Sequence, residues 1–96
     1  MADWCVFLGV EGDPARFDAD QAADSLMDLV AEYGGVVAAD ETGWGVTLTQ
    51  VAPDPFSALV AAVETVPGLA ERAGFPGWPL VRLEVGPYGG EAPFRR

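Results

Sequence analysis

Residues 3–11 have the sequence DWCVFLGVE, which is rich in aromatic and β-branched residues and is followed by the turn-forming Gly12-Asp13-Pro14. This pattern predicts a first β-strand and indicates that the chain starts with a strand and not with a signal peptide. Successive side chains of a strand point to opposite faces. The better inward set is Trp4, Val6, Leu8 and Val10. The outward set is Cys5, Phe7, Gly9 and Glu11.

Two further segments carry helix signals. The first runs from about Asp18 to Tyr33, with Asp18 as the N-cap, Gln21 completing a capping box, and Gly34-Gly35 as the left-handed stop. The second opens at Asp54-Pro55 and is expected to end or kink at Pro67-Gly68. Its expected buried face is Phe56, Leu59, Val60 and Val63.

Three more strands complete the pattern. Val36–Asp40 and Trp44–Val51 flank a short glycine-bearing turn and are expected to form a hairpin, and Leu80–Val85 is the last strand. Alternation along the third strand points Val46 and Leu48 inward and Thr47 and Thr49 outward. In the last strand the expected inward set is Val81, Leu83 and Val85, and the outward set is Leu80, Arg82 and Glu84.

The resulting order is βαββαβ, which predicts an α+β fold. Residues 3–86 resemble the ferredoxin-like fold, a two-layer sandwich with an antiparallel sheet of order 4-1-3-2 and two helices on one face. We therefore expect a ferredoxin-like domain over residues 1–86 and a Gly/Pro-rich tail over 87–96. The stretches DWCVFLGVEGD and GFPGWPLVRLEV also resemble a small family of actinobacterial and actinophage proteins. That resemblance implies no particular activity.

Composition excludes several classes of chemistry. The 96 residues include no histidine, no lysine and a single cysteine, Cys5. A Ser-His-Asp triad, an imidazole metal site, a phosphate-loop lysine and a zinc site of several cysteines within one chain are therefore excluded. We expect a non-enzymatic cytoplasmic protein, with a reduced thiol, no cofactor and no membrane span.

The outward face of the sheet is the first candidate site. Its expected partner-binding residues are Cys5, Phe7, Thr47, Thr49 and Arg82. Exposed aromatics on a sheet are typical of RNA-recognition motifs, but a net charge of −10 disfavours direct contact with nucleic acid. We expect a protein partner or self-association, a dimer included. The alternatives are that the C-terminal tail covers Phe7, or that Phe7 is a tolerated exposed aromatic residue.

The first helix carries the second candidate site. Residues 1–48 hold ten acidic residues and one arginine, whereas residues 49–96 hold five acidic residues and four arginines. Carboxylates four residues apart form one helical stripe: Asp20, Asp24, Asp28 and Glu32. This acidic stripe is typical either of a solvated face or of a phosphate-mimicking inhibitor of a nucleic-acid-binding protein.

A third hypothesis concerns one end of the sheet. The topology is expected to gather the carboxylates of Glu11, Asp13, Asp40 and Glu41 there. Such a group could bind Mg²⁺ or Ca²⁺, although the same residues are fully explained as polar turns, and we expect no metal. Gly9, Gly12 and Asp13 also resemble, in general position, the ligand loop of ACT-type regulatory domains. A small-ligand or metal-binding regulatory domain is therefore the second alternative to an interaction module.

Overall fold

The computed structural model describes residues 2–87, and its elements follow the chain in the expected βαββαβ order. They are β1 (Ala2–Glu11), α1 (Ala19–Val30), a 3₁₀ turn η1 (Ala31–Tyr33), β2 (Val36–Asp40), β3 (Gly43–Ala52), α2 (Pro55–Ala73) and β4 (Leu80–Pro87). The tail expected over residues 87–96 lies, from residue 88 onward, outside the described residues. None of the described helices is long and apolar enough to cross a membrane.

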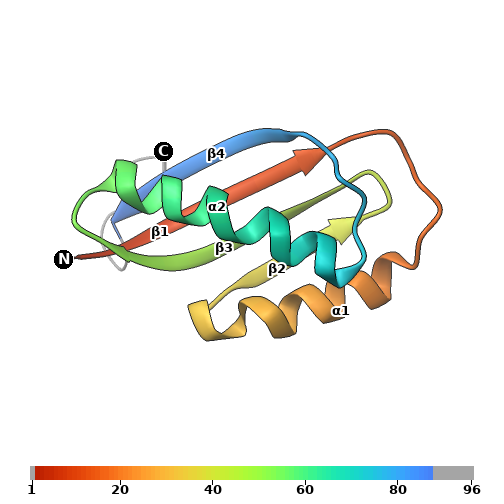
Figure 1. Cartoon of the computed structure of the whole chain (residues 1–96), viewed down its shortest axis with the longest axis horizontal. Coiled ribbons are helices and arrows are strands. Elements are labelled where there is room, and N and C mark those ends of the chain that lie inside the picture. The colour runs from red at the N-terminus through yellow and green to blue at the C-terminus, as the bar shows by residue number, and fades with distance from the viewer. Residues whose placement is uncertain (1, 88–96) are drawn as a thin grey trace.

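The four strands form one antiparallel sheet of order β2-β3-β1-β4, which confirms the expected order read from the other edge. Both helices cover the same face of the sheet (Figure 1). Helix α1 packs against β2, and α2 lies across β3, β1 and β4. The architecture is a two-layer α+β sandwich, compatible with a ferredoxin-like arrangement.

The core lies between the sheet and the helices, as the alternation along β1 predicted. The side chains of Val6 and Leu8 are completely buried, and Val10 is nearly so. Trp4, at the start of the same row, is half-buried, and its indole N–H donates a hydrogen bond of 3.1 Å to the carbonyl of Ala52. The inward residues of β3 are buried as well, so the two central strands together form the floor of the core.

Helix α1 begins as predicted and ends earlier. The Asp18 carboxylate accepts a hydrogen bond of 3.0 Å from the backbone N–H of Gln21. The Gln21 side chain donates to the hydroxyl of Ser25 at 3.3 Å, so the reciprocal half of the capping box is not formed. The α-helix ends at Val30 and η1 continues it to Gly34, whose φ of 66° provides the left-handed stop.

The predicted buried face of α2 was wrong at its larger residues. Phe56 is 74% exposed and Val60 is 38% exposed, whereas Leu59 and Val63 are partly buried against the core. Small alanine side chains allow the helix to lie close to the sheet, and this close approach turns the larger residues sideways or outward. The fully buried residues are spaced four apart: Ala58, Ala62, Val66 and Ala70.

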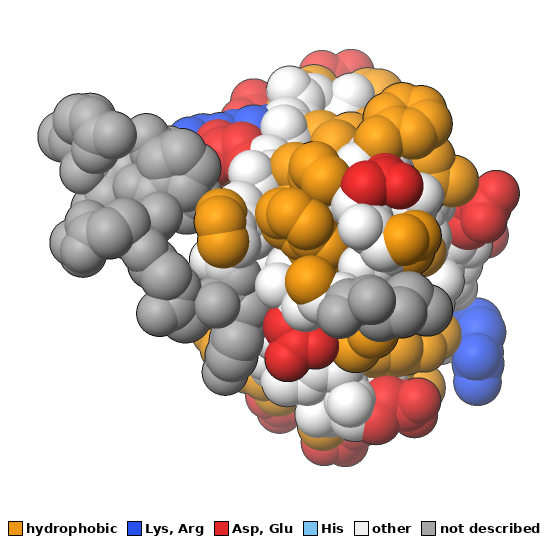
Figure 2. Space-filling model, turned by 90° about the vertical axis from the view of Figure 1, so that its left-hand side faces the viewer, with side chains coloured by type: hydrophobic (Ala, Val, Ile, Leu, Met, Phe, Trp, Pro, Cys, Tyr) orange, Lys and Arg blue, Asp and Glu red, His pale blue; other side chains and the backbone are white. Residues whose placement is uncertain are grey.

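Two further features of α2 concern its length and its exposed end. The helix continues through Pro67 to Ala73, so Pro67-Gly68 does not end it. Figure 2 shows apolar side chains at the surface on the end of the molecule where α2 begins.

The faces predicted for the first two residues of β4 were also wrong. Arg82 lies opposite Gly9 and Leu80 lies opposite Val10, so one residue, Val81, is inserted into the ladder as a β-bulge. Leu80 consequently lies on the helix side of the sheet and Val81 on the open side, the reverse of the prediction. From Arg82 onward the predicted alternation is confirmed.

An aromatic cluster joins the two loops at one end of the sheet. The rings of Phe17 and Phe75 meet edge to face at 5.5 Å, and those of Phe17 and Trp78 at 5.6 Å. The indole N–H of Trp78 donates a hydrogen bond of 3.0 Å to the carbonyl of Asp13, and the ring lies directly on Gly12. The loop after β1 and the loop before β4 are therefore fixed to each other.

We expect Gly12→Ala to destabilise the protein, because a Cβ at this position would overlap the Trp78 ring and force it away from Asp13. The expected loss is about 1–3 kcal/mol of unfolding free energy. Gly77→Ala is the matched control, since a Cβ there meets no atom within 4 Å; its effect should stay below about 0.5 kcal/mol. Urea unfolding followed by tryptophan fluorescence measures both. Equal effects would contradict the role assigned to Trp78.

Candidate interaction surface on the open sheet face

The strand register brings the predicted partner-binding residues together on the uncovered face of the sheet. Phe7 lies between Thr47 of β3 and Glu84 of β4, and Cys5 lies opposite Thr49. Sequence analysis had placed Glu84 outward but had not included it in the site. The open-face cluster is defined here as these residues and Arg82, one row further along: Cys5, Phe7, Thr47, Thr49, Arg82 and Glu84.

Phe7 does not stand freely in solvent. Gly9 and Gly45 are cross-strand partners, and a Cβ on either would lie 3.2 Å or 3.0 Å from the nearest atom of the Phe7 ring. The ring therefore lies over this pair of glycines and is half-buried. An aromatic ring over a glycine on a sheet replaces the contacts that a missing side chain would make. The pairing of Gly9 with Gly45 could not be predicted from the sequence, because it depends on the register of β1 and β3.

Arg82 covers the Phe7 ring from β4. Its guanidinium carbon lies 5.5 Å from the ring centroid, which is the geometry of a cation–π contact, and its Nε donates to the Glu84 carboxylate at 2.5 Å. The Arg82 side chain is 66% exposed and that of Glu84 is 31% exposed, so solvent screens this ion pair and it contributes about 0–1 kcal/mol. The main effect of the two contacts is to hold Phe7 and Arg82 in one arrangement.

Two hollows flank the Phe7–Arg82 stack. One, of about 240 Å³, is lined by five members of the open-face cluster: Cys5, Phe7, Thr47, Arg82 and Glu84. The other, of about 430 Å³, shares Phe7 and Arg82 and extends over Gly9 and Gly45 toward Asp40. The Phe7 ring, which lies over the glycine pair, forms part of the wall of this second hollow.

Exposed valines extend the apolar character of this face. Val36 is 62% exposed, Val51 is 56% exposed and Val81 is 55% exposed. Val36 lies opposite Thr47, Val51 lies opposite Asp3, and the bulge brings Val81 to the rim of the larger hollow. The open face therefore combines an ordered aromatic–arginine centre with aliphatic side chains around it.

The acidic stripe lies on the helix layer, on the other side of the sheet from the open-face cluster. All four of its residues are exposed, three on α1 and one on η1: Asp20, Asp24, Asp28 and Glu32. The last turn of α1 contains no basic residue that would pair with them. The two predicted surfaces thus form separate sites.

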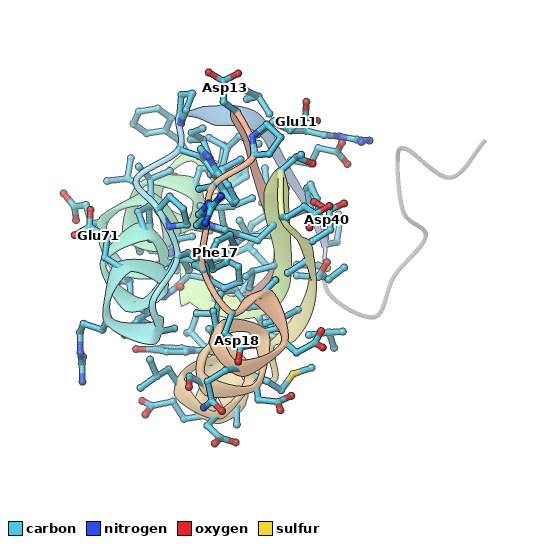
Figure 3. All side chains as sticks on the ribbon, turned by 90° about the vertical axis from the view of Figure 1, so that its right-hand side faces the viewer. Glu11, Asp13, Phe17, Asp18, Asp40 and Glu71 are labelled. Carbon is cyan, nitrogen blue, oxygen red and sulfur yellow. The ribbon has the colours of Figure 1, made fainter. Side chains whose placement is uncertain are left out.

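The carboxylates at the end of the sheet do not converge. Among residues 2–87, no three acidic or cysteine side chains are grouped closely enough to hold a metal ion. Figure 3 shows Glu11, Asp13 and Asp40 spread around this end of the molecule. The Asp40 carboxylate instead accepts hydrogen bonds of 2.8 Å from the backbone N–H and from the hydroxyl of Thr42. This is the geometry of a polar turn between β2 and β3.

Comparisons with known protein families, with curated proteins and with solved structures find no match to this chain. The similarity to actinobacterial and actinophage proteins therefore has no family match behind it. The assignment of a functional site depends on the geometry of the surface alone.

The backbone N–H and then the hydroxyl of Thr42 lower the pKa of Asp40 below its ordinary value. We expect Thr42→Val to raise this pKa part of the way back, because the backbone donor remains. A carboxyl whose pKa is lowered on folding stabilises the fold above its unfolded pKa, and this contribution is lost as pH falls through the folded pKa. The variant should therefore lose less stability on acidification.

Carbon-detected NMR titration of the Asp40 carboxyl group measures this change. Thr47→Val is the control, because Thr47 is outside the Asp40 turn and should leave the titration unchanged. An unchanged Asp40 pKa in Thr42→Val would contradict the role of the hydroxyl.

Proposed function

We propose that this protein is a non-enzymatic interaction or assembly module that binds another protein through the open-face cluster. The observation that carries this proposal is the cation–π contact of Arg82 with Phe7, which lies on a central strand of a sheet face that no described helix covers. The resemblance noted in the sequence and the single thiol favour the cytoplasm of an actinobacterium or of its phage as the setting.

The chemistry of the cluster favours a protein partner. Aromatic residues and arginine are enriched at the energetic centres of protein interfaces. The Gly9–Gly45 pair already positions the Phe7 ring and the Glu84 carboxylate restrains Arg82, which lowers the side-chain entropy cost of binding. The flanking hollows can receive side chains of the partner, and the exposed valines provide apolar area around them.

Charge argues against nucleic acid as the direct ligand. Single-stranded nucleic acids bind to aromatic platforms that lie within a positively charged groove. Among the described residues, one arginine, already paired with Glu84, is the only basic side chain lining either of the two hollows, and the chain has a net charge of −10. Repulsion of phosphate would oppose stacking on Phe7.

Phe7→Asp should weaken binding of the partner by tenfold or more, since truncation of a central anchor costs about 2 kcal/mol or above. Phe56→Asp is a matched control: it makes the same change at a residue that is 74% exposed on α2, away from the open face. Pull-down from host lysate at low and moderate salt, with both variants, measures the retained protein. Binding should persist at moderate salt, because apolar contacts are not screened.

Retention of the same partner by Phe7→Asp would contradict the proposal, whatever the result for Phe56→Asp. Loss in both variants at equal level would also contradict it, since the open face would then have no special part. Circular dichroism of each variant verifies that the helices and the sheet are intact.

An acidic inhibitor of a nucleic-acid-binding protein is the alternative function, favoured by the exposure and spacing of the acidic stripe. Asp20, Asp24 and Asp28 recur at about 6 Å of axial rise per step. Like charges four residues apart destabilise a helix by a few tenths of a kcal/mol per pair, so helix stability does not explain the pattern.

If the acidic stripe is the binding surface, the double variant Asp24→Asn, Asp28→Asn should lose the partner, and wild-type binding should fall steeply with salt. The double variant Asp24→Glu, Asp28→Glu keeps the charge and should keep the binding. Pull-down across a salt series compares them. Equal retention by the Asn and Glu variants would rule out this function.

A further inference from the structure

Strand β4 is the edge of the sheet next to the open-face cluster, and within residues 2–87 no strand pairs with its outer side. An edge strand presents a row of backbone N–H and C=O groups that can accept another strand. The opposite edge, β2, has five residues, whereas β4 has eight. The longer edge is therefore the one available for pairing.

This edge exposes aliphatic side chains on both faces of the sheet. Leu83 lies opposite the buried Leu8, so it belongs to the helix side, and it is nevertheless 38% exposed. Val81 belongs to the open side and is 55% exposed. Proteins commonly protect such edges with charged side chains, proline and β-bulges. In β4 the bulge and the proline lie near the two ends of the strand. The two charged residues of β4, Arg82 and Glu84, have opposite signs.

Among the three registers centred on Arg82, Leu83 or Glu84, the order of these charges favours one for self-pairing. In an antiparallel pair of identical strands related by a two-fold axis, directly opposed residues share a face of the sheet. The axis therefore passes midway between the two copies of one residue. An axis at Arg82 opposes two arginines, and an axis at Glu84 opposes two carboxylates. An axis at Leu83 places Arg82 of each copy opposite Glu84 of the other, with the two Leu83 side chains in contact. The regular part of β4 begins at Arg82, after the bulge, so all three positions lie in undistorted strand.

The distribution of charge is compatible with this arrangement despite the net charge of −10. The acidic stripe is on α1 and η1, and α1 packs against β2, at the far edge of the sheet. In the paired arrangement seven strand spacings, roughly 33 Å, separate the β2 strands of the two copies. This exceeds the Debye length of about 8 Å at physiological salt, so the acidic helices of two copies paired at β4 would repel each other weakly.

From these observations we infer that β4 is a homodimerisation edge: a second copy of this chain pairs antiparallel to it in the register centred on Leu83. The product is an eight-stranded sheet with all four helices on one face and two open-face clusters, side by side, on the other. This inference is independent of the proposed function, because the open face can bind its partner with or without dimerisation.

Charge exchange on the purified full chain tests the inference. In Arg82→Glu the new carboxylate faces Glu84 of the second copy, and in Glu84→Arg the new guanidinium faces Arg82 of the second copy. Each single variant should dissociate more readily than wild type, on the order of tenfold or more in dimer dissociation constant, because two attractive cross-strand pairs become repulsive. The double exchange, Arg82→Glu with Glu84→Arg, restores both pairs and should restore the dimer.

A mixture of the two single variants provides the sharpest measurement. In a heterodimer of Arg82→Glu with Glu84→Arg, every cross-strand pair again joins opposite charges, although neither variant pairs well with itself. Light scattering over a concentration series, with native mass spectrometry of the mixture, should show the heterodimer as the predominant dimer.

Three outcomes would overturn the inference. They are a monomeric wild-type protein at the highest concentration reached, dimers of equal stability in the wild type and the single variants, or a mixture with no preference for the heterodimer. The purified chain reports only on dimerisation, whereas loss of a partner in Phe7→Asp reports on the open face. Failure of one is therefore distinguishable from failure of the other.

Discussion

Burial of one row of β1 side chains under the helices is the constraint from which both faces of the sheet follow. Strand β1 pairs along its whole length with β3 and on its other side with β4, so it is central. Its buried row contains Val6, Leu8 and Val10. Because the period of a strand is two residues, burial of this row fixes Phe7 and Gly9 on the uncovered face.

The Phe7 ring is held in position on the uncovered face by contacts with residues of its own and the neighbouring strands. The Gly9–Gly45 pair leaves space for the Phe7 ring to lie against the backbone, and Arg82 covers the ring from β4. The Glu84 carboxylate in turn holds Arg82. A larger residue at either glycine would displace the ring, so the glycines and the phenylalanine form one unit although they come from two strands.

The sequence was informative where a local pattern and the tertiary fold agree. The βαββαβ order, through its resemblance to the ferredoxin-like fold, predicted the sheet order, and the alternation in β1 and β3 predicted the face on which the open-face cluster lies. In α2 the pattern was ambiguous, because large apolar residues suggested one face and alanines occupied another. The alanine face was buried since it permits the closer approach of helix to sheet, and Phe56 was left exposed.

The remaining differences between prediction and structure come from contacts between segments that are distant in the sequence. The bulge at Val81 depends on how β4 meets β1, and the clamp of Trp78 on the Asp13 carbonyl joins residues 65 positions apart. Neither leaves a periodic signal in the chain.

Arg82 connects the two surfaces to which we assign a role. On the open face its guanidinium covers Phe7, and along β4 it lies beside Leu83 with a charge opposite to that of Glu84. A guanidinium can do both, because its planar face stacks on a ring while its N–H edge donates to a carboxylate. Pairing with Glu84 of a second copy would draw the Arg82 guanidinium toward the outer side of β4, while the Phe7 ring, on the β1 side, keeps its place over the glycine pair. Dimerisation at the edge and binding at the open face are therefore physically compatible, and the first would place two copies of the second on one continuous sheet.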